Sequence, residues 1–394
     1  MRQELLDCLS EVQELTDLLK SAFVGKDHLI ELIVTCAIAQ EHVLIIGPPG
    51  TAKSELIKRF ALLCNSTKSG DGGGSIPYFE YLLTRFTEPN EIFGPVDILR
   101  FQQGGGHQRI TTGMLPRAEI AFLDEVFKAN SAILNALLTV LNERVFYNGG
   151  RPEPVPLLCA IGASNEVPDD PALAALYDRF LVRLWTDNVE ETRFGELFIR
   201  GWEIERYRIN KGYKLELGNV TTTDTFRLLY SELGEVSLNG VAREYREVIR
   251  RIRAEGIEFS DRRVIKLLKL IAAAALRRGS TEANPGDFWV LRHVWNNQDQ
   301  IPHLQTIVGA YLEGYADVRW KPERDVQSID NEINVLNARH ASLRTDADYA
   351  DFLQQAERLR QELGRHSDGA ARERLQKRLE GLIDKVMALL SQQP

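Results

Sequence analysis

The segment Gly47–Ser54, which reads GPPGTAKS, limits the possible folds of this 394-residue chain more than any other feature. It follows the apolar run Val43–Ile46 and precedes the helical pattern Glu55–Leu63, so a strand, a loop of small residues and a helix succeed one another. Backbone N–H groups of such a loop, with the N-terminus of the helix behind it, cradle phosphate oxygens. The segment therefore predicts a polyphosphate site, in which Lys53 reaches the β- and γ-phosphates and the Ser54 hydroxyl binds Mg²⁺.

One position departs from the pattern that phosphate-binding loops share, because Ala52 stands where that pattern has glycine. Alanine is compatible with the loop if its φ is that of a right-handed helix, since only a positive φ demands glycine. The residues assigned to phosphate binding are Gly47, Pro48, Pro49, Gly50, Thr51, Ala52, Lys53 and Ser54.

Apolar, strand-like segments alternate with helical ones between about residues 41 and 186. This alternation predicts a parallel sheet with helices on both faces. Residues 1 to about 40 have helical spacing with a break at Phe23–Gly25, and helices dominate again from about 190 to about 300. The predicted strands are Val43–Ile46, Tyr78–Leu83, Ile120–Leu123, Leu157–Ile161 and Phe180–Trp185.

Three side chains beyond the loop fit a hydrolytic site. Asp124 and Glu125 end the third predicted strand, and Asn165 follows the fourth. In a parallel sheet every C-terminal strand end falls on one side, which is the side of Lys53. There Asp124 suits coordination of Mg²⁺, Glu125 suits orienting or deprotonating the attacking water, and the Asn165 amide can position that water. These residues favour hydrolysis of the nucleotide over its binding alone.

The last part of the chain has a sharper helical repeat. Apolar residues recur at alternating intervals of four and three in three segments, which predicts three heptad helices packed as a bundle or arm. We therefore expect an α/β core over residues 1–195, an all-helical lid over 196–304 and a three-helix bundle or arm over 305–394. The seam residues are Ile329, Ile333, Leu336, His340 and Leu343, then Phe352, Ala356, Leu359 and Leu363, then Leu375, Leu379, Leu382, Val386 and Leu389.

Charge and composition narrow the class of protein. The formal net charge of −8 and the isoelectric point of about 5.6 give no general attraction to nucleic acid. The four cysteines match no metal or redox spacing, so we expect reduced, buried thiols in a cytoplasmic protein. We expect no signal peptide and no membrane segment, since the apolar runs are far shorter than about 20 residues. Two glycine clusters, Gly70–Gly74 and Gly104–Gly106, are expected as mobile surface loops.

The chain resembles the MoxR group of AAA+ ATPases, and most closely its RavA-like branch. The similarity extends over about residues 40 to 300, in family order, and implies an α/β P-loop AAA+ core, an all-helical lid and assembly into a homo-hexameric ring. The resembling stretches read GPPGTAKS, FEYLLTRFTEPNEIFGPVDI, TTGMLPRAEIAFLDEVFKANSAILNALLTVLNER, ASNEVP, ALYDRFLVRLW and SDRRVIKLLKL.

The resemblance also implies roles for single residues. Asn165 would be the sensor-1 residue, Arg179 the arginine finger that reaches the neighbouring subunit's nucleotide, and Arg262 the sensor-2 residue of the lid. Ser260 suits a helix N-cap, which places Arg262 and its rival Arg263 in a first helical turn, where the macrodipole disfavours cations. An anionic partner such as a γ-phosphate would offset that cost. Pairing of these arginines with neighbouring carboxylates is the alternative.

The resemblance implies a Mg²⁺-dependent ATPase that remodels or matures client proteins with a von Willebrand factor A domain partner. The segments 93–106 and 145–156 resemble a pore-facing helix-2 insert and the hairpin before sensor 1, and both are candidate substrate-contacting loops. Three alternatives stay open: the motor subunit of a metal chelatase, a nucleic-acid translocase, and a regulatory nucleotide switch. The acidic balance argues against the translocase.

Overall fold

A computed structural model of the chain describes residues 2–65, 78–102, 106–168, 170–189, 191–211, 220–312, 315, 326–339, 349, 352, 355–356, 359–360, 363 and 369–390. Its contacts divide the chain into two units, Met1–Trp320 and Lys321–Pro394, which are described separately. The predicted glycine-rich loops fall largely outside the described residues, as does His340.

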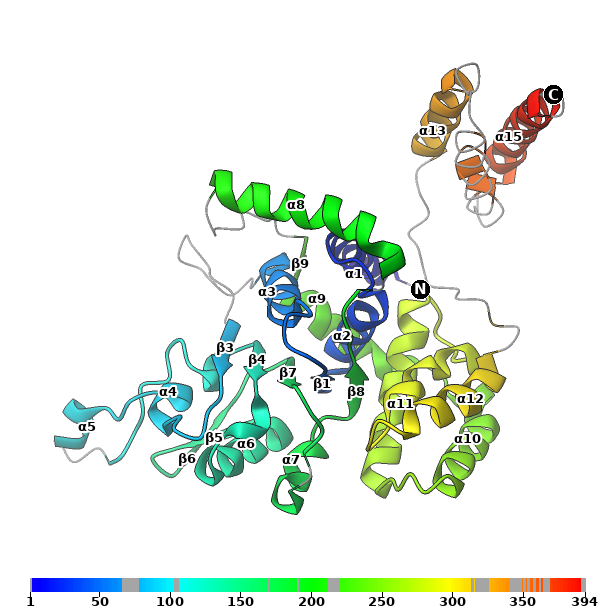
Figure 1. The fold of residues 1–394 in the computed structure, drawn as a ribbon. Helices are drawn as coiled ribbons and strands as arrows, with labels where there is room; N and C mark the ends of the chain where they lie inside the picture. The colour runs from blue at the N-terminus through cyan, green and yellow to red at the C-terminus, as the bar shows by residue number, and fades with distance from the viewer. Residues whose placement is uncertain are drawn as a thin grey trace. The chain divides into compact units, whose positions relative to one another are not determined.

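Most of the first unit consists of short strands and helices in alternation (Figure 1). Its strands are β1 (Val43–Ile46), β2 (Cys64–Asn65), β3 (Tyr78–Leu82), β4 (Ile120–Asp124), β5 (Val145–Asn148), β6 (Arg151–Pro154), β7 (Cys159–Ser164), β8 (Val182–Trp185) and β9 (Thr221–Thr222). Its α-helices are α1 (Gln3–Ala22), α2 (Asp27–Ala39), α3 (Lys53–Leu63), α4 (Pro89–Phe93), α5 (Ile98–Gln102), α6 (Ser131–Glu143), α7 (Ala174–Tyr177), α8 (Phe194–Lys211), α9 (Thr223–Glu232), α10 (Ala242–Ala254), α11 (Asp261–Arg277) and α12 (Gln300–Leu312). Its 3-10 helices are η1 (Leu115–Arg117), η2 (Val126–Lys128), η3 (Pro171–Leu173), η4 (Glu191–Arg193), η5 (Leu233–Glu235), η6 (Asn239–Val241) and η7 (Pro285–His293).

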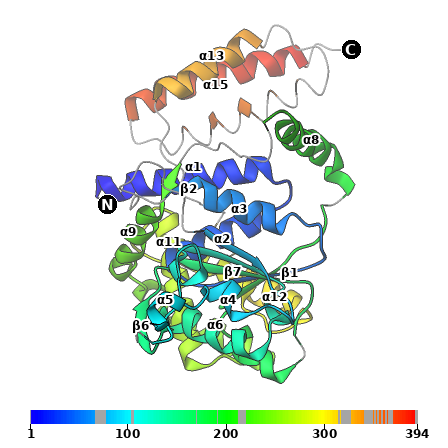
Figure 2. The same cartoon turned by 90° about the vertical axis from the view of Figure 1, so that its left-hand side faces the viewer.

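The central sheet has five parallel strands in the order β3-β4-β7-β1-β8. Strand β1 lies between β7 and β8, where Val43 is in register with Ile161 on one side and Val182 on the other. All five predicted strands are present, and β1 and β7 are buried over their whole length. Helices α1 to α3 lie on one side of the sheet and α6 on the other (Figures 1 and 2). The predicted α/β fold with a parallel sheet is confirmed.

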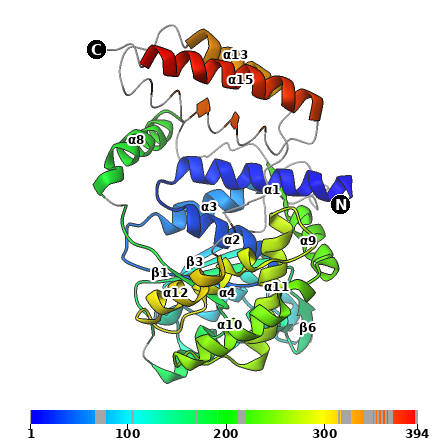
Figure 3. The same cartoon turned by 90° about the vertical axis from the view of Figure 1, so that its right-hand side faces the viewer.

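Helices α9 to α12 and the 3-10 helix η7 form the helical part of this unit, and Figure 3 shows α10, α11 and α12 together. Helix α11 packs along α2, and η7 packs against α12 and β8. The boundary predicted after residue 304 falls inside α12, whose Leu304 and Val308 belong to the main hydrophobic core. We therefore place this boundary after α12. The predicted start of the lid at residue 196 falls within α8.

Residues 84–102 and 106–110, which follow β3 and include α4 and α5, are called the arm, and α5 lies farthest from the sheet (Figure 1). The predicted hairpin is the antiparallel pair β5–β6, whose turn has positive φ at Gly149 and Gly150. Arm and hairpin are tied together, because the Asn148 side chain accepts from the Arg109 N–H at 2.6 Å and donates to the Arg109 carbonyl at 3.2 Å. The aromatic rings of Phe86 and Tyr147 are 91% and 58% exposed, so neither is a core residue.

The second unit contains α13 (Val326–Arg339) and α15 (Gly369–Leu390), and it has a hydrophobic cluster of its own. This cluster includes members of all three predicted seams, such as Ile333, Phe352 and Leu379, each at most 1% exposed. The heptad spacing therefore identified the buried faces of the C-terminal segments correctly.

All four cysteines are free and buried, as predicted. Within the described part of the chain, every helix is too short or too polar to cross a bilayer.

Candidate functional site

The phosphate loop runs from the end of β1 to the start of α3, as the sequence predicts. Its first residue, Gly47, donates its N–H to the Ser164 carbonyl at 3.1 Å. A Cβ atom on Gly47 would lie 2.0 Å from the Thr186 carbonyl oxygen, so only glycine fits between β7 and β8 there. Lys53 is 9% exposed and its Nζ donates to the carbonyls of Gly47 at 2.6 Å and Pro48 at 3.2 Å. Burial lowers the pKa of Lys53, and the carboxylates across the loop oppose that shift.

The backbone of Ala52 does not have the right-handed helical φ that would make alanine compatible with the loop. Its φ is 61° and its ψ is 24°, so it lies in the left-handed region and not in the right-handed one. This conformation costs an alanine about 1 kcal/mol or more relative to glycine. Ala52 is the N-cap of α3, a position where backbone is typically extended, so helix capping does not account for its left-handed conformation. The phosphate loop therefore has a conformation that alanine by itself disfavours.

The predicted acidic residues and Asn165 meet at the carboxyl edge of the sheet. Asp124 ends β4, and its Oδ1 accepts the N–H of Glu125 at 3.0 Å. The Glu125 Oε1 accepts from Asn165 Nδ2 at 2.5 Å and lies 3.2 Å from Lys128 Nζ. The negative charges of both carboxylates favour the protonated form of Lys53 and so raise its pKa. Lys53, Asp124, Glu125 and Asn165 are thus brought together as predicted, and Lys128 was missed.

The oxygen donors at this edge fit a magnesium ion. Mg²⁺ takes few protein ligands, because substrate phosphates and waters fill its other positions. Ser54 lies in the first turn of α3 and Asp124 ends β4, so a hydroxyl and a carboxylate are available as hard oxygen ligands near the phosphate loop. Among the described residues, no group of three or more His, Cys, Asp or Glu side chains could hold a metal unaided. The site therefore suits a metal that arrives with a phosphate.

A cavity of about 500 Å³ adjoins the loop and was missed by sequence reasoning. Lys26 lines it, and its buried Nζ donates to Thr186 Oγ1 at 2.8 Å and to the Asp187 carbonyl at 2.7 Å. The backbone of the same Thr186 touches Gly47. The only sequence signal was the break in the helical pattern before Lys26. The apolar part of the wall includes Leu29, Leu184, Trp185, Trp295 and Ile301.

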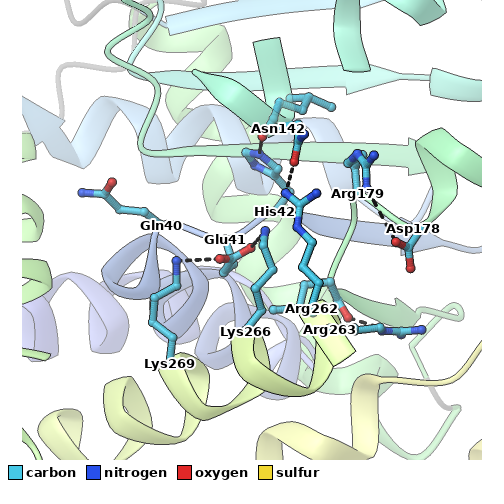
Figure 4. Close-up of polar contacts among 12 residues, drawn as sticks. Gln40, Glu41, His42, Asn142, Asp178, Arg179, Arg262, Arg263, Lys266 and Lys269 are labelled. Atoms are coloured by element: carbon cyan, nitrogen blue, oxygen red, sulfur yellow. Dashed lines mark hydrogen bonds and ion pairs between the residues drawn. The ribbon is translucent and has the colours of Figure 1, made fainter. Parts of the chain in front are cut away.

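The two arginines Arg179 and Arg262 lie together, but not beside the loop of their own chain. They line one small pocket with Asp178, Ser260 and Lys266. Arg179 lies 3.7 Å from the Asp178 carboxylate, and its buried Nε has no hydrogen-bond partner among the described residues. Arg262 reaches from α11 to the Asn142 side chain (Figure 4).

This pocket lies at the amino edge of the sheet. Asp178 and Arg179 precede β8, whereas the phosphate loop follows β1 and Glu125 follows β4. The central strands have four to six residues at ~3.3 Å each, so about 13–20 Å separates the two edges. That distance exceeds the reach of an arginine side chain.

The neighbouring Arg263 has a different environment. Ser260 caps α11 as predicted, since its Oγ accepts the Arg263 N–H at 3.2 Å. The Arg263 guanidinium is buried and donates to Asn296 Oδ1 at 2.8 Å and to the Val294 carbonyl at 2.7 Å. Burial, reinforced by the nearby Arg183, lowers the pKa of Arg263 to about 9. Arg263 also donates to the Leu181 carbonyl at 3.4 Å, which joins the lid to the core, whereas Arg262 is exposed.

Comparisons with known proteins agree on one family. A family model described as the MoxR domain of MoxR–vWA–β-propeller ternary systems matches residues 10–224, and a model of an AAA lid domain matches residues 241–308. Two uncharacterised proteins of Methanocaldococcus jannaschii, MJ0812 and MJ0079, are 34% and 33% identical to this chain. Those similarities cover 83% and 84% of this chain and 82% and 83% of the relatives.

Two further matches are more distant. The chaperone MoxR1 of Mycobacterium tuberculosis is 30% identical over 42% of this chain and 41% of its own length. A solved structure from Cytophaga hutchinsonii, described as that of a candidate ATPase, has a TM-score of 0.60 at 17% identity. It covers 79% of this chain and 96% of that one, and it supports the fold alone.

Proposed function

The chain belongs to the MoxR family of AAA+ ATPases, and we propose that it hydrolyses ATP with Mg²⁺ at sites shared between subunits of a ring hexamer. We further propose that the ring acts as a chaperone that remodels client proteins or complexes. Four free, buried thiols support a cytoplasmic location. Assignment to the RavA-like branch stays a prediction.

One observation carries the shared site: the phosphate loop and the pocket of Arg179 and Arg262 lie at opposite edges of the same sheet. Neither arginine can reach its own loop across the length of a strand. A neighbouring subunit that presents its amino edge to this loop would supply both. Arginine supplied in this way stabilises the charge that develops on a transferred phosphoryl group, which is worth ~10³–10⁵ in rate.

Residues of the loop side have separate roles in this proposal. Lys53 releases the Gly47 and Pro48 carbonyls and binds phosphate oxygens, while Ser54 and Asp124 hold Mg²⁺. The metal, when bound, neutralises phosphate charge. Glu125 takes the proton of the attacking water, and Asn165 fixes the Glu125 carboxylate through their 2.5 Å hydrogen bond.

Between the two lid arginines, we assign the sensor role to Arg262. Arg263 is 4% exposed and occupied by Asn296 and two backbone carbonyls, so a phosphate cannot approach it without breaking those bonds. Both arginines line the pocket that contains Arg179, but of the two only Arg262 is exposed.

The surface for client proteins is proposed at the arm and the hairpin. These segments carry exposed large apolar side chains, which a folded monomer rarely leaves together without a binding role. The family model names systems that include a von Willebrand factor A protein, which supports such a protein as partner. The exposed residues are Phe86, Ile98, Leu99, Phe101, Ile110 and Tyr147.

The shared site is tested by mixing two inactive chains, Arg179→Ala and Lys53→Ala. Arg179→Ala should bind ATP nearly normally but hydrolyse it slowly, and Lys53→Ala should fail to bind. In mixed rings, the intact loop of the first chain meets the intact arginine of the second, so activity should return. ATPase rate is measured against mixing ratio while subunits exchange. A rate that never exceeds the weighted sum of the two chains would overturn the proposal.

A further inference from the structure

Glu41 is a buried carboxylate that none of the roles above uses. It lies in the short connection between α2 and β1, at the amino edge of the sheet, and its side chain is 3% exposed. Its two oxygens accept from two lysines of α11, Lys266 Nζ at 2.8 Å and Lys269 Nζ at 2.5 Å. Figure 4 shows both lysines pointing from α11 toward Glu41. The carboxylate thus ties the lid helix to the core.

This tie lies next to the trans-acting arginines. Lys266 is one helical turn beyond Arg262, and it lines the pocket that Arg262 shares with Arg179. Holding Lys266 therefore helps to hold the turn of α11 from which Arg262 leaves the helix, together with the buried Arg263. At the other side of this turn, Arg262 contacts Asn142 from α6. Arg262 is consequently held between two parts of the core.

The charges explain why Glu41 matters more than an ordinary surface acid. Arg262, Lys266 and Lys269 place three cations on one stretch of α11, and these repel one another. Glu41 offsets that repulsion from a position where water screens it little. The lysine side chains are 32% and 28% exposed, so without Glu41 both ammonium groups can turn into solvent. Loss of the carboxylate should therefore let the Lys266 turn of α11 shift while the buried face of the helix stays packed, and it leaves no buried, unpaired charge.

We propose that Glu41 is a positioning residue for the arginine side of the shared site. By holding Lys266 and Lys269 it keeps α11 where Arg262 stands beside Arg179, ready for the nucleotide of the neighbouring subunit. This inference rests on the proposed function, since it concerns the arginines that a subunit offers to its neighbour.

Glu41→Gln removes the charge and keeps the shape of the side chain. Displacing a positioned group by ~1 Å can cost ~10² in rate. We therefore expect kcat to fall about 10–100-fold while KM for ATP stays within about twofold, because the phosphate loop of the same chain is untouched. Glu247→Gln is the matched control. Glu247 also pairs with two cations, Arg250 and Arg251, but on the exposed face of α10, and its loss should leave kcat unchanged.

Mixing experiments then locate the defect. Glu41→Gln mixed with Lys53→Ala should regain activity, because intact loops meet intact arginines in the mixed rings. Glu41→Gln mixed with Arg179→Ala should regain none, since both chains are defective on the arginine side. A general folding defect gives no such pattern. If Glu41→Gln is insoluble, Lys266→Met takes its place in the same mixtures, because Lys269 still pairs with the buried Glu41 carboxylate.

The outcomes separate this inference from the proposed function. Failure of Arg179→Ala to complement Lys53→Ala removes the shared site itself. If that pair succeeds, three results overturn the role of Glu41: full activity of Glu41→Gln, no rescue by Lys53→Ala, or rescue by Arg179→Ala.

Discussion

The backbone of Glu125 lies in the left-handed region, with φ of 51°, directly after the buried strand β4. A residue other than glycine pays about 1 kcal/mol for this conformation, and such costs concentrate where a side chain must be aimed. Here the Glu125 carboxylate contacts Asn165 and Lys128. The orientation of the Glu125 carboxylate is therefore fixed by its backbone and by the side chains of Asn165 and Lys128.

Glu125→Gln tests this role, because the amide keeps the shape of the side chain and cannot accept a proton. ATP affinity should stay near wild type, since Lys53 and Ser54 are unchanged. Hydrolysis should fall by ~10² or more. Binding is measured with a fluorescent ATP analogue and turnover by phosphate release. Turnover at the wild-type rate would show that another group serves as base.

Residues that follow a strand were predictable from the sequence, and residues defined by distant partners were not. Asp124, Glu125 and Asn165 could be placed because a buried apolar run precedes each of them. Lys26 and Glu41 have partners 160 and 225 positions away along the chain, so no local pattern marks them. Arg262 and Arg263 are adjacent in one helical turn, and only packing shows which one is buried.

At the scale of elements, burial decided which segments could be predicted. Strands β1, β4 and β7 are surrounded on both faces, so nearly every residue in them is apolar and the run is visible in the sequence. Helix α12 has a weaker signal, because only Leu304 and Val308 are buried in it. Its attachment to the main core therefore became visible only through its contacts with η7.

Because α12 belongs to the main core, a chain that ends at residue 320 and one that ends at residue 304 should differ sharply in stability. A chain that ends at residue 320 should be soluble and should hydrolyse ATP, since it keeps the whole first unit. A chain that ends at residue 304 loses the buried Val308, and each such side chain stabilises the fold by about 1.5–3 kcal/mol. Soluble yield and thermal midpoint of the two chains provide the measurement. Equal stability of both would contradict the assignment of α12 to the core.

At the scale of the whole molecule, the separation of loop and arginines predicts that an isolated chain is a poor enzyme. ATPase rate per chain should rise with protein concentration and follow the assembled fraction, measured by light scattering in the same samples. Arg179→Ala should assemble over the same range with little gain in rate, and it serves as the control. A monomer fraction that hydrolyses ATP as fast as the assembly would contradict the prediction.

The positions of the phosphate loop and of the arginine pocket also restrict the symmetry of the assembly. Each chain offers its loop on one edge of the sheet and its arginines on the other, so a contact between neighbours joins two different surfaces. Two copies joined by one such head-to-tail contact leave one loop and one arginine set over, because the surfaces that meet lie on opposite edges and are not shared by a two-fold axis. The contact is satisfied everywhere only when successive rotations return the last copy to the first. The angle between neighbours therefore decides between a closed ring and a helical filament, and residues far from any phosphate can change that angle.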